Sequence, residues 1–277
     1  MEFGARRAHG IDAGIRAARA AYIAGFGSTS IVEAGRRFGI PLSGTMAHSW
    51  VMAFADETTA FRKYAEVFGE AVFILDTYDA VAAARMVATS GLRPKAVRID
   101  SGDQIAISRE VRRIFDEHGL VDTAIVASGD LDEMRIAEIV AAGAPVDGFG
   151  VGTAVSTSSD APALSGVYKL AEIERDGRDV AVLKKSPGKR TYPGRKQVWR
   201  VMRDGIAVED VLALDGAQPP ADAEPLLRQV MKNGERLSRP SLNEIRDRCR
   251  QRVATLPGEI TQLIDGKKYP VRVRIAS

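Results

Sequence analysis

A short stretch from Gly44 to Trp50 combines a Gly-Thr pair with a histidine, His48. It follows the apolar residues 40–42 and precedes residues 51–68, which have a helical pattern. Backbone N–H groups and the dipole at the start of a helix favour an anion, so the stretch is typical of a site that handles phosphate. A histidine after a strand is also commonly a hydrogen-bonded structural residue, and the stretch alone does not separate the two interpretations.

The elements that must position this histidine alternate along the first part of the chain. Apolar segments with polar or Gly-rich ends occupy residues 40–45, 71–77, 96–101, 123–128 and 148–153. Helical patterns lie between them, at residues 51–68, 79–89, 104–118 and 131–142, and a further helix with Asp12 as its N-cap is predicted before them. Strands and helices that alternate at this spacing indicate βα units on a parallel sheet buried on both faces.

Polar residues recur where these predicted strands end. They are Thr45 and His48, Asp76 and Asp79, Arg98 with Asp100, Ser128-Gly129-Asp130, and Gly150-Val151-Gly152-Thr153. In an α/β barrel the carboxyl ends of the strands share one face, which carries the active site, and a Gly-rich last strand end commonly binds phosphate. The pattern therefore predicts an enzyme that acts on a phosphorylated small molecule.

Each of these residues also has a plain structural interpretation. Asp76, Asp100 and Asp130 could be N-caps or loop residues that open the following helices, and the glycines at 150 and 152 could serve a tight turn. Arg98 is the sharper signal, because a charged side chain inside an apolar strand is costly unless it is paired or binds an anion.

The chain changes character after residue 165, so we predict a catalytic α/β part at 1–165 and a β-rich and helical part at 166–277. Hairpins are expected about Asp176-Gly177 and Asp204-Gly205, and a linker at residues 218–225. A basic helix with a Ser241 to Glu244 capping box and a terminal strand at 269–275 follow. The basic residues 184–196 are interpreted as an ordered turn overlooking an anionic site, since no aromatic interleaving favours nucleic acid.

Composition excludes several classes of protein. The 277 residues are 45% apolar and 27% charged, with a net charge of +3 and a single cysteine, Cys249. One cysteine allows no intramolecular disulfide, and with three histidines it makes a structural zinc site improbable. No apolar run approaches the roughly 20 residues of a membrane span, and no signal peptide is visible, so we expect a cytoplasmic protein without membrane partners.

Taken together, the motifs resemble those of nicotinate phosphoribosyltransferase over nearly the whole chain. The resemblance rests on Phe3-Gly4-x-Arg6-Arg7-Ala8-His9-Gly10, Gly44 to His48, Leu75-Asp76-Thr77-Tyr78-Asp79, Val97-Arg98-Ile99-Asp100-Ser101-Gly102-Asp103, Ser128-Gly129-Asp130, Gly150-Val151-Gly152-Thr153, Asp160-Ala161-Pro162-Ala163-Leu164, Val167-Tyr168-Lys169-Leu170, Ser186-x-Gly188-Lys189-x-Thr191-x-Pro193-Gly194-x-Lys196-Gln197-Val198 and the tail from Glu224 to Pro257.

The resemblance implies a fold and a reaction. The fold would be an irregular α/β barrel of the type II phosphoribosyltransferases with a smaller mixed β-rich appendage. The reaction would join nicotinate to phosphoribosyl pyrophosphate, giving nicotinate mononucleotide and pyrophosphate, with ATP as co-substrate, Mg²⁺ present and a homodimer as the assembly.

Residue roles also follow from the resemblance. His48 matches the histidine that ATP phosphorylates, Thr45 and Arg98 match contacts to nicotinate, and Thr153 with Gly150 and Gly152 matches the phosphoribosyl-phosphate site. The same opening of the active site would also be lined by Ser128, Gly129, Asp100 and Asp130. Metal ligands are not assigned.

Three interpretations stay open at this point. Family members carry a segment before Phe3-Gly4 that supplies part of the small domain and an aromatic contact to nicotinate, so the first strand of this chain is expected to be truncated. The chain is then either such an enzyme, an inactive remnant of it with a structural or regulatory role, or a related phosphoribosyltransferase without ATP coupling, in which His48 would be silent.

Overall fold

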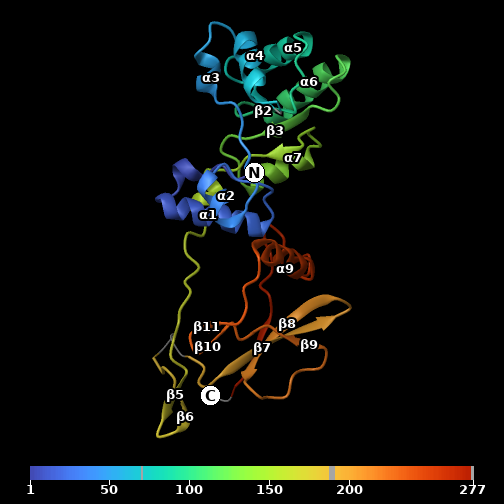
Figure 1. Cartoon of the computed structure of the whole chain (residues 1–277). Coiled ribbons are helices and arrows are strands. Elements are labelled where there is room, and N and C mark those ends of the chain that lie inside the picture. The colour runs from blue at the N-terminus through green and yellow to red at the C-terminus, as the bar shows by residue number, and fades with distance from the viewer. Residues whose placement is uncertain (70, 187–190, 276–277) are drawn as a thin grey trace. The chain divides into compact units, whose positions relative to one another are not determined.

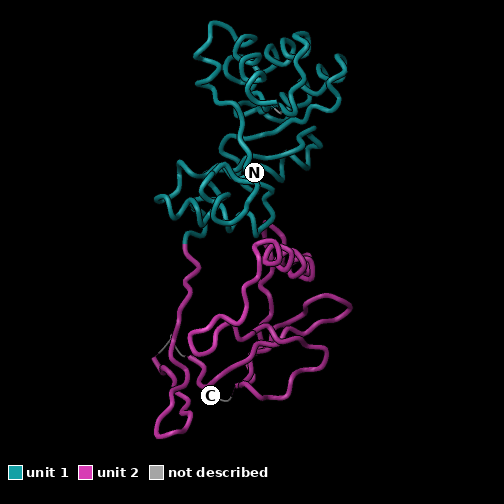
Figure 2. Tube along the Cα trace, in the orientation of Figure 1, with its two compact units in different colours: residues 1–162 teal, residues 163–277 magenta. Residues whose placement is uncertain are grey.

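The computed structural model of the chain describes residues 1–69, 71–186 and 191–275. By their contacts the residues divide into two compact units, unit 1 (Met1–Pro162) and unit 2 (Ala163–Ser277) (Figure 2). No helix in the described ranges is both long enough and apolar enough to cross a membrane.

Unit 1 alternates helices with short strands (Figure 1). In chain order its elements are the 3-10 helix η1 (Ala5–Arg7), α1 (Ile11–Ala24), α2 (Val32–Phe38), α3 (His48–Met52), α4 (Glu57–Val67), β1 (Val72–Ile74), α5 (Ala80–Thr89), β2 (Ala96–Ile99), α6 (Gln104–Glu117), β3 (Ala124–Ala127), α7 (Glu133–Ala141), β4 (Gly148–Phe149) and α8 (Thr153–Thr157). Strands β1 to β4 pair in parallel in the order of the sequence. The predicted α/β class is confirmed.

Two predicted elements of unit 1 are wrong in detail. Residues 40–45 form no strand, and Leu42 makes only an isolated bridge to Thr29. The helix predicted over residues 51–68 is two helices, because the Asp56 side chain accepts a hydrogen bond from the backbone N–H of Thr59 at 2.8 Å and starts α4 afresh. Asp12 lies inside the first turn of α1, and the N-cap is Gly10.

Single bridges continue the hydrogen bonding beyond the parallel sheet. Val151 bridges to Glu2, Glu2 to Thr29, and Thr29 to Leu42. The backbone N–H of Met46 then donates to the carbonyl of Val72 in β1 at 3.1 Å. These contacts lead from the β4 side around to β1 through isolated bridges rather than strands, so the barrel itself stays a prediction.

The main core of unit 1 lies between β1, β2 and the helices α4, α5 and α6. Phe61 of α4 and Phe73 of β1 are fully buried and their rings stack at 4.9 Å between centroids. Small residues on α5, such as Ala83 and Ala84, are also fully buried, which lets that helix approach the strands closely. The apolar side chains of β1 and β2 therefore pack against these helices, and this packing fixes the carboxyl ends of both strands.

Unit 2 is rich in strands, as the sequence predicts for the smaller part. Its elements are β5 (Glu172–Arg175), β6 (Arg178–Ala181), β7 (Lys196–Arg203), β8 (Ile206–Leu214), β9 (Ala223–Pro225), β10 (Met231–Lys232), β11 (Glu235–Arg236), α9 (Leu242–Ala254) and β12 (Val271–Arg274). The larger sheet has the order β12-β8-β7-β9. It is mixed, since β12 is parallel to β8 while β7 is antiparallel to β8 and β9.

Local sequence signals explain much of unit 2. Both expected hairpins are confirmed, and Asp176-Gly177 and Asp204-Gly205 have the positive φ angles that two-residue hairpin turns require. The capping box of Ser241 and Glu244 is present on α9. The linker predicted at 218–225 is wrong at its end, because residues 223–225 form β9 and pair with β7. β9 is an edge strand, where the missing N–H of Pro225 leaves no ladder bond unmade. Residues 187–190 of the basic run lie outside the described residues.

Candidate functional site

Two adjoining pockets lie at the carboxyl ends of the parallel strands in unit 1. Their volumes are about 170 Å³ and about 280 Å³, and they share Phe3, Arg6, Arg98 and Asp100. The smaller pocket is further lined by Arg7, Ser128, Gly129, Asp130, Gly150, Gly152 and Thr153. The larger one is completed by Ala47 and His48.

Arg98 is the most heavily bonded side chain of the site. Its Nε donates to Ser128 Oγ at 2.7 Å, its Nη1 donates to Thr45 Oγ1 at 2.8 Å, and its Nη2 donates to Asp100 Oδ1. Its guanidinium carbon also lies 5.3 Å from the centroid of the Phe3 ring. The side chain is 17% exposed, so the guanidinium is held rigidly at the border of both pockets.

Asp100 forms an ion pair with Arg98 and is also bonded to Ser128, which follows β3. Its Oδ1 accepts a second hydrogen bond, from Ser128 Oγ at 2.6 Å. Burial raises the pKa of the Asp100 carboxyl, but the hydrogen bonds from Ser128 and Arg98 and the charges of Arg98 and His48 outweigh burial and hold that pKa below its ordinary value. Asp100 is therefore a carboxylate at neutral pH.

His48 opens α3 and faces a buried carboxylate. Its Nε2 lies 3.3 Å from Asp76 Oδ1, and the His48 side chain is 39% exposed while that of Asp76 is 6% exposed. Asp76 Oδ2 accepts hydrogen bonds from the Asp100 backbone N–H at 3.0 Å and from Ser101 Oγ at 2.5 Å. One carboxylate thus connects the histidine to the strand end that carries Asp100.

The glycines of the site are required by close packing. Gly129 has φ +93°, and a Cβ there would lie 1.8 Å from the Asp100 carbonyl oxygen. A Cβ on Gly150 would lie 2.4 Å from the Phe3 ring. The turns after β3 and β4 can therefore approach Asp100 and Phe3 only without side chains, and Asp130 follows with φ +48°.

Replacing Gly129 by alanine is expected to destabilise the fold by about 3 kcal/mol or more, because the backbone clash adds to the strain of a positive φ. The matched control is Gly119→Ala, at φ +72° with no atom within 4 Å of the added Cβ, which should cost only about 1–2 kcal/mol. Urea unfolding of both variants measures the difference. Equal midpoints would show that the contact with Asp100 relaxes freely.

The structure brings the sequence-predicted site residues together. Thr45 lines neither pocket but accepts the hydrogen bond from Arg98, and the other nine line one pocket or both. The capping interpretation of the strand-end aspartates is wrong. Asp79, Asp103 and Asp132 accept from the first backbone N–H groups of α5, α6 and α7, while Asp76, Asp100 and Asp130 precede those caps.

Sequence reasoning missed several contributors. Phe3, Arg6 and Arg7 line the pockets, although the Phe-Gly-x-Arg-Arg motif by itself indicates only the family resemblance. The sequence places Asp76 at a strand end and assigns it no catalytic role. Buried Gln104 was missed altogether, and its Nε2 donates to the Ser128 carbonyl at 2.5 Å. A polar side chain at the first position of a buried helix face was the available signal for Gln104.

The chemistry of the donor set suits a negatively charged ligand. Arg6 and Arg7 have no ion pair within the described part of the chain and border the glycine turns. Among the same residues, no group of three or more His, Cys, Asp or Glu side chains is placed to hold a metal ion. A Mg²⁺ ion that arrives on phosphate oxygens needs only one or two protein carboxylates, and Asp100 is suitably ionised.

Comparisons with known proteins agree over nearly all of the chain. Residues 1–211 match the model of the nicotinate phosphoribosyltransferase (NAPRTase) family, and residues 218–275 match the nicotinate phosphoribosyltransferase C-terminal domain. The chain is 44% identical to nicotinate phosphoribosyltransferase pncB2 of Mycobacterium tuberculosis, over 99% of this chain and 60% of that protein. It is 48% identical to nicotinate phosphoribosyltransferase of Bacillus subtilis, over 73% of this chain and 43% of that protein.

Solved structures show the same fold. The human nicotinic acid phosphoribosyltransferase matches with a TM-score of 0.79 and 27% identity, over 98% of this chain and 67% of that one. Nicotinate-nucleotide pyrophosphorylase from Pyrococcus furiosus matches with a TM-score of 0.75 and 30% identity, over 92% and 65%. The chain thus spans about 60% of the length of the M. tuberculosis relative. By its family match over residues 1–211, the chain belongs to the nicotinate phosphoribosyltransferase family.

Proposed function

We propose that this chain carries the site of a nicotinate phosphoribosyltransferase, which forms nicotinate mononucleotide and pyrophosphate from nicotinate and phosphoribosyl pyrophosphate. The observation that carries the proposal is Arg98, fixed by Thr45, Ser128 and Asp100 at the border of two pockets. In the reaction the pyridine nitrogen bonds to ribose C1, and the bond from C1 to the pyrophosphate oxygen breaks.

Nicotinate suits the part of the site around Arg98. A guanidinium carries five N–H donors, and three donate to Ser128, Thr45 and Asp100. The remaining N–H groups can receive the nicotinate carboxylate, and the Phe3 ring offers an apolar face to the pyridine. Nicotinamide lacks the negative charge that this arrangement favours, so we expect the acid to be preferred.

Phosphoribosyl pyrophosphate suits the glycine turns and the charges around them. Gly150 and Gly152 line the smaller pocket, Thr153 offers a hydroxyl donor, and Arg6 and Arg7 add positive charge. The carboxylates of Asp100 and Asp130 can stabilise the positive charge that develops on the ribose as pyrophosphate leaves. Mg²⁺ would accompany the pyrophosphate and neutralise its charge when bound.

ATP coupling is proposed to run through His48. Because Nε2 faces Asp76 Oδ1, the tautomer with its proton on Nε2 leaves the Nδ1 lone pair as the nucleophile. Nδ1 attacks the γ-phosphorus, the bond to the ADP oxygen breaks, and ADP leaves. Asp76 stabilises the imidazolium charge that phosphorylation creates. The exposed side chain of His48 and the neighbouring Arg6 support access for a triphosphate.

The test of the function is direct. The chain is incubated with nicotinate and phosphoribosyl pyrophosphate, with and without ATP, and nicotinate mononucleotide and pyrophosphate are quantified against a parallel reaction with nicotinamide. We expect product from the acid, stimulated by ATP. A folded sample that neither binds nicotinate in calorimetry nor makes product would favour the inactive remnant. Product formed at the same rate with and without ATP would favour the related phosphoribosyltransferase without ATP coupling. The expected homodimer is checked by light scattering.

Asp76→Asn is expected to slow phosphorylation of His48 by roughly 10- to 100-fold, because it removes a charge-assisted hydrogen bond to the imidazole. Single-turnover transfer from γ-labelled ATP measures this rate. The control is Asp79→Asn, which removes a nearby carboxylate charge but keeps an N-cap oxygen for α5 and does not touch the histidine. Nicotinate affinity should be retained in both variants. Equal labelling rates would remove Asp76 from the mechanism.

A further inference from the structure

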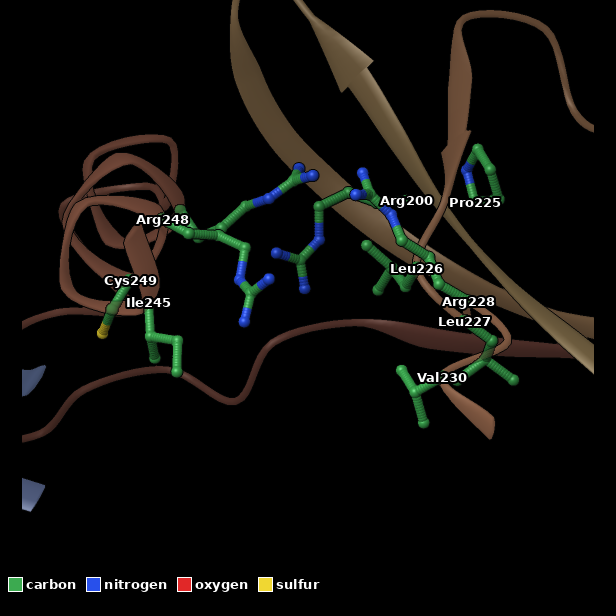
Figure 3. Close-up of a pocket in the computed structure, with 10 residues that line it drawn as sticks. Arg200, Pro225, Leu226, Leu227, Arg228, Val230, Ile245, Arg248 and Cys249 are labelled. Atoms are coloured by element: carbon green, nitrogen blue, oxygen red, sulfur yellow. The ribbon is translucent and has the colours of Figure 1, made fainter. Parts of the chain in front are cut away.

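Unit 2 contains a pocket of its own, of about 560 Å³. It lies between α9, which contributes Ile245, Arg248, Cys249 and Arg252, and the strand side, which contributes Arg200, residues 225–228 and Val230 (Figure 3). Figure 3 shows guanidinium groups lying in the space between the helix and the strands. The volume falls within the range of small-molecule sites, roughly 300–1,000 Å³.

The pocket carries an excess of positive charge. Arg200 donates to both carboxylate oxygens of Asp210, at 2.9 and 3.0 Å, and Arg252 pairs with Glu224. Arg228 and Arg248 have no ion-pair partner within residues 1–69, 71–186 and 191–275, and no acidic side chain lines the pocket there. Two guanidinium charges in one concavity therefore stay uncompensated by the described part of the protein.

The arginines that are already paired build the walls of this pocket. Asp210 holds Arg200 from one side, and the Tyr269 ring lies 5.4 Å from its guanidinium carbon. Tyr269 Oη also donates to Asp210 Oδ1 at 3.3 Å. Arg200 is thus 16% exposed and fixed, whereas Arg228 and Arg248 are exposed and available to a ligand.

The rest of the lining is apolar. Leu226 and Ile245 are half-buried and Val230 is 61% exposed, so these side chains offer a surface to a flat ring. Guanidinium forks suit phosphate oxygens, and like charges in a concave site attract an anion. The combination fits a ligand with phosphate at one end and an apolar ring at the other.

We propose that this pocket binds a nucleotide, with its phosphates on Arg228 and Arg248 and its base against Leu226, Val230 and Ile245. The site lies wholly in unit 2 and does not use the residues assigned to the proposed reaction. A nucleotide is favoured over a bare anion because of the apolar wall, and over an acidic peptide because the space is a pocket of limited volume.

Cys249 gives a reporter that is specific to this pocket. It is the single cysteine of the chain and lines the pocket half-buried. The rate of its alkylation by iodoacetamide is measured with ADP, adenosine or inorganic phosphate as the probe. With ADP at ten times its dissociation constant the rate should fall about tenfold, since only the unliganded fraction reacts. Adenosine and inorganic phosphate should protect less than ADP. Salt at 0.5 M should weaken protection by ADP, because the Debye length then falls between about 3 and 10 Å and screens the charges of phosphate and arginine.

Variants separate this pocket from the site in unit 1. Arg228→Ala/Arg248→Ala should lose protection, and Arg228→Lys/Arg248→Lys should keep part of it because the charge remains. The control Arg250→Ala lies on the same helix, paired with Asp247 and outside the pocket, and should keep full protection. Circular dichroism checks that each variant is folded.

Three results would overturn the proposal. They are no protection by millimolar ADP, protection that survives in the double alanine variant, and inorganic phosphate protecting as well as ADP. The second would mean that binding elsewhere alters Cys249. The third would mean that the pocket takes a bare anion and that the apolar wall contributes nothing.

Discussion

His48→Ala is expected to take up no acid-labile phosphate from γ-labelled ATP, and its rates of nicotinate mononucleotide formation with and without ATP should become equal. The reason is that the imidazole is the nucleophile in the proposed coupling and alanine offers none. The fold should be unaffected, since His48 is at the solvent-exposed start of α3. Phosphate on the protein is followed by acid and base stability, and product by chromatography.

The control for this experiment is His118→Ala. His118 is the C-cap of α6 and its Nδ1 lies 2.8 Å from the Ile114 carbonyl oxygen, so the substitution removes an imidazole without altering either pocket. It should keep both the label and the ATP stimulation. If His48→Ala were labelled like the unmodified chain, the phosphohistidine proposal would be wrong, while transfer of the phosphoribosyl group could still proceed.

Arg98→Lys is expected to lower kcat/KM for nicotinate by about 30- to 1,000-fold, which corresponds to about 2–4 kcal/mol. Lysine keeps the charge but loses the planar fork that binds Ser128, Thr45 and Asp100 at once. Asp100 would then lack a fixed partner, and the nicotinate carboxylate would meet a mobile ammonium group. The effect should appear mainly in KM for nicotinate and less in KM for phosphoribosyl pyrophosphate.

Arg112→Lys is the matched control because Arg112 has similar burial and bonding. Its side chain is 20% exposed, and its three donors reach Asp116 and the carbonyls of Thr123 and Leu120 at 2.7–2.8 Å. Both variants should lose stability, but only Arg98→Lys should lose activity. A fall in activity no larger than that of Arg112→Lys would mean that Arg98 only supports the fold.

Some features of this protein follow from local sequence. The Asp-Gly turns at 176–177 and 204–205 adopt the positive φ that the hairpins need, and Ser241 with Glu244 caps α9, because these preferences act within a few residues. The apolar strands and their alternation with helices also follow, since burial on both faces of a parallel sheet demands that pattern. The type and order of most elements were therefore predictable.

Other features depend on contacts between distant parts of the chain. The pattern could not distinguish Asp76 from Asp79 as the cap of α5, because both are aspartates next to the helix. Only the packing turns Asp76 toward His48 and leaves Asp79 on the helix. Likewise, residues 40–45 look like a strand, but their neighbours offer one bridge at Leu42 and no ladder.

Sequence by itself determined the family, the α/β class and the residue types of the site. The tertiary structure decided their arrangement. Arg98 meets Thr45 across 53 residues of chain and Ser128 across 30, and these bonds exist because β2 is paired with β3 and the segment after Leu42 returns to β1. Such contacts depend on strand pairing and core packing, whose energies no local pattern contains. The same reason explains why Arg228 and Arg248, which are 20 residues apart in the sequence and belong to no motif, share a pocket only in the folded unit 2.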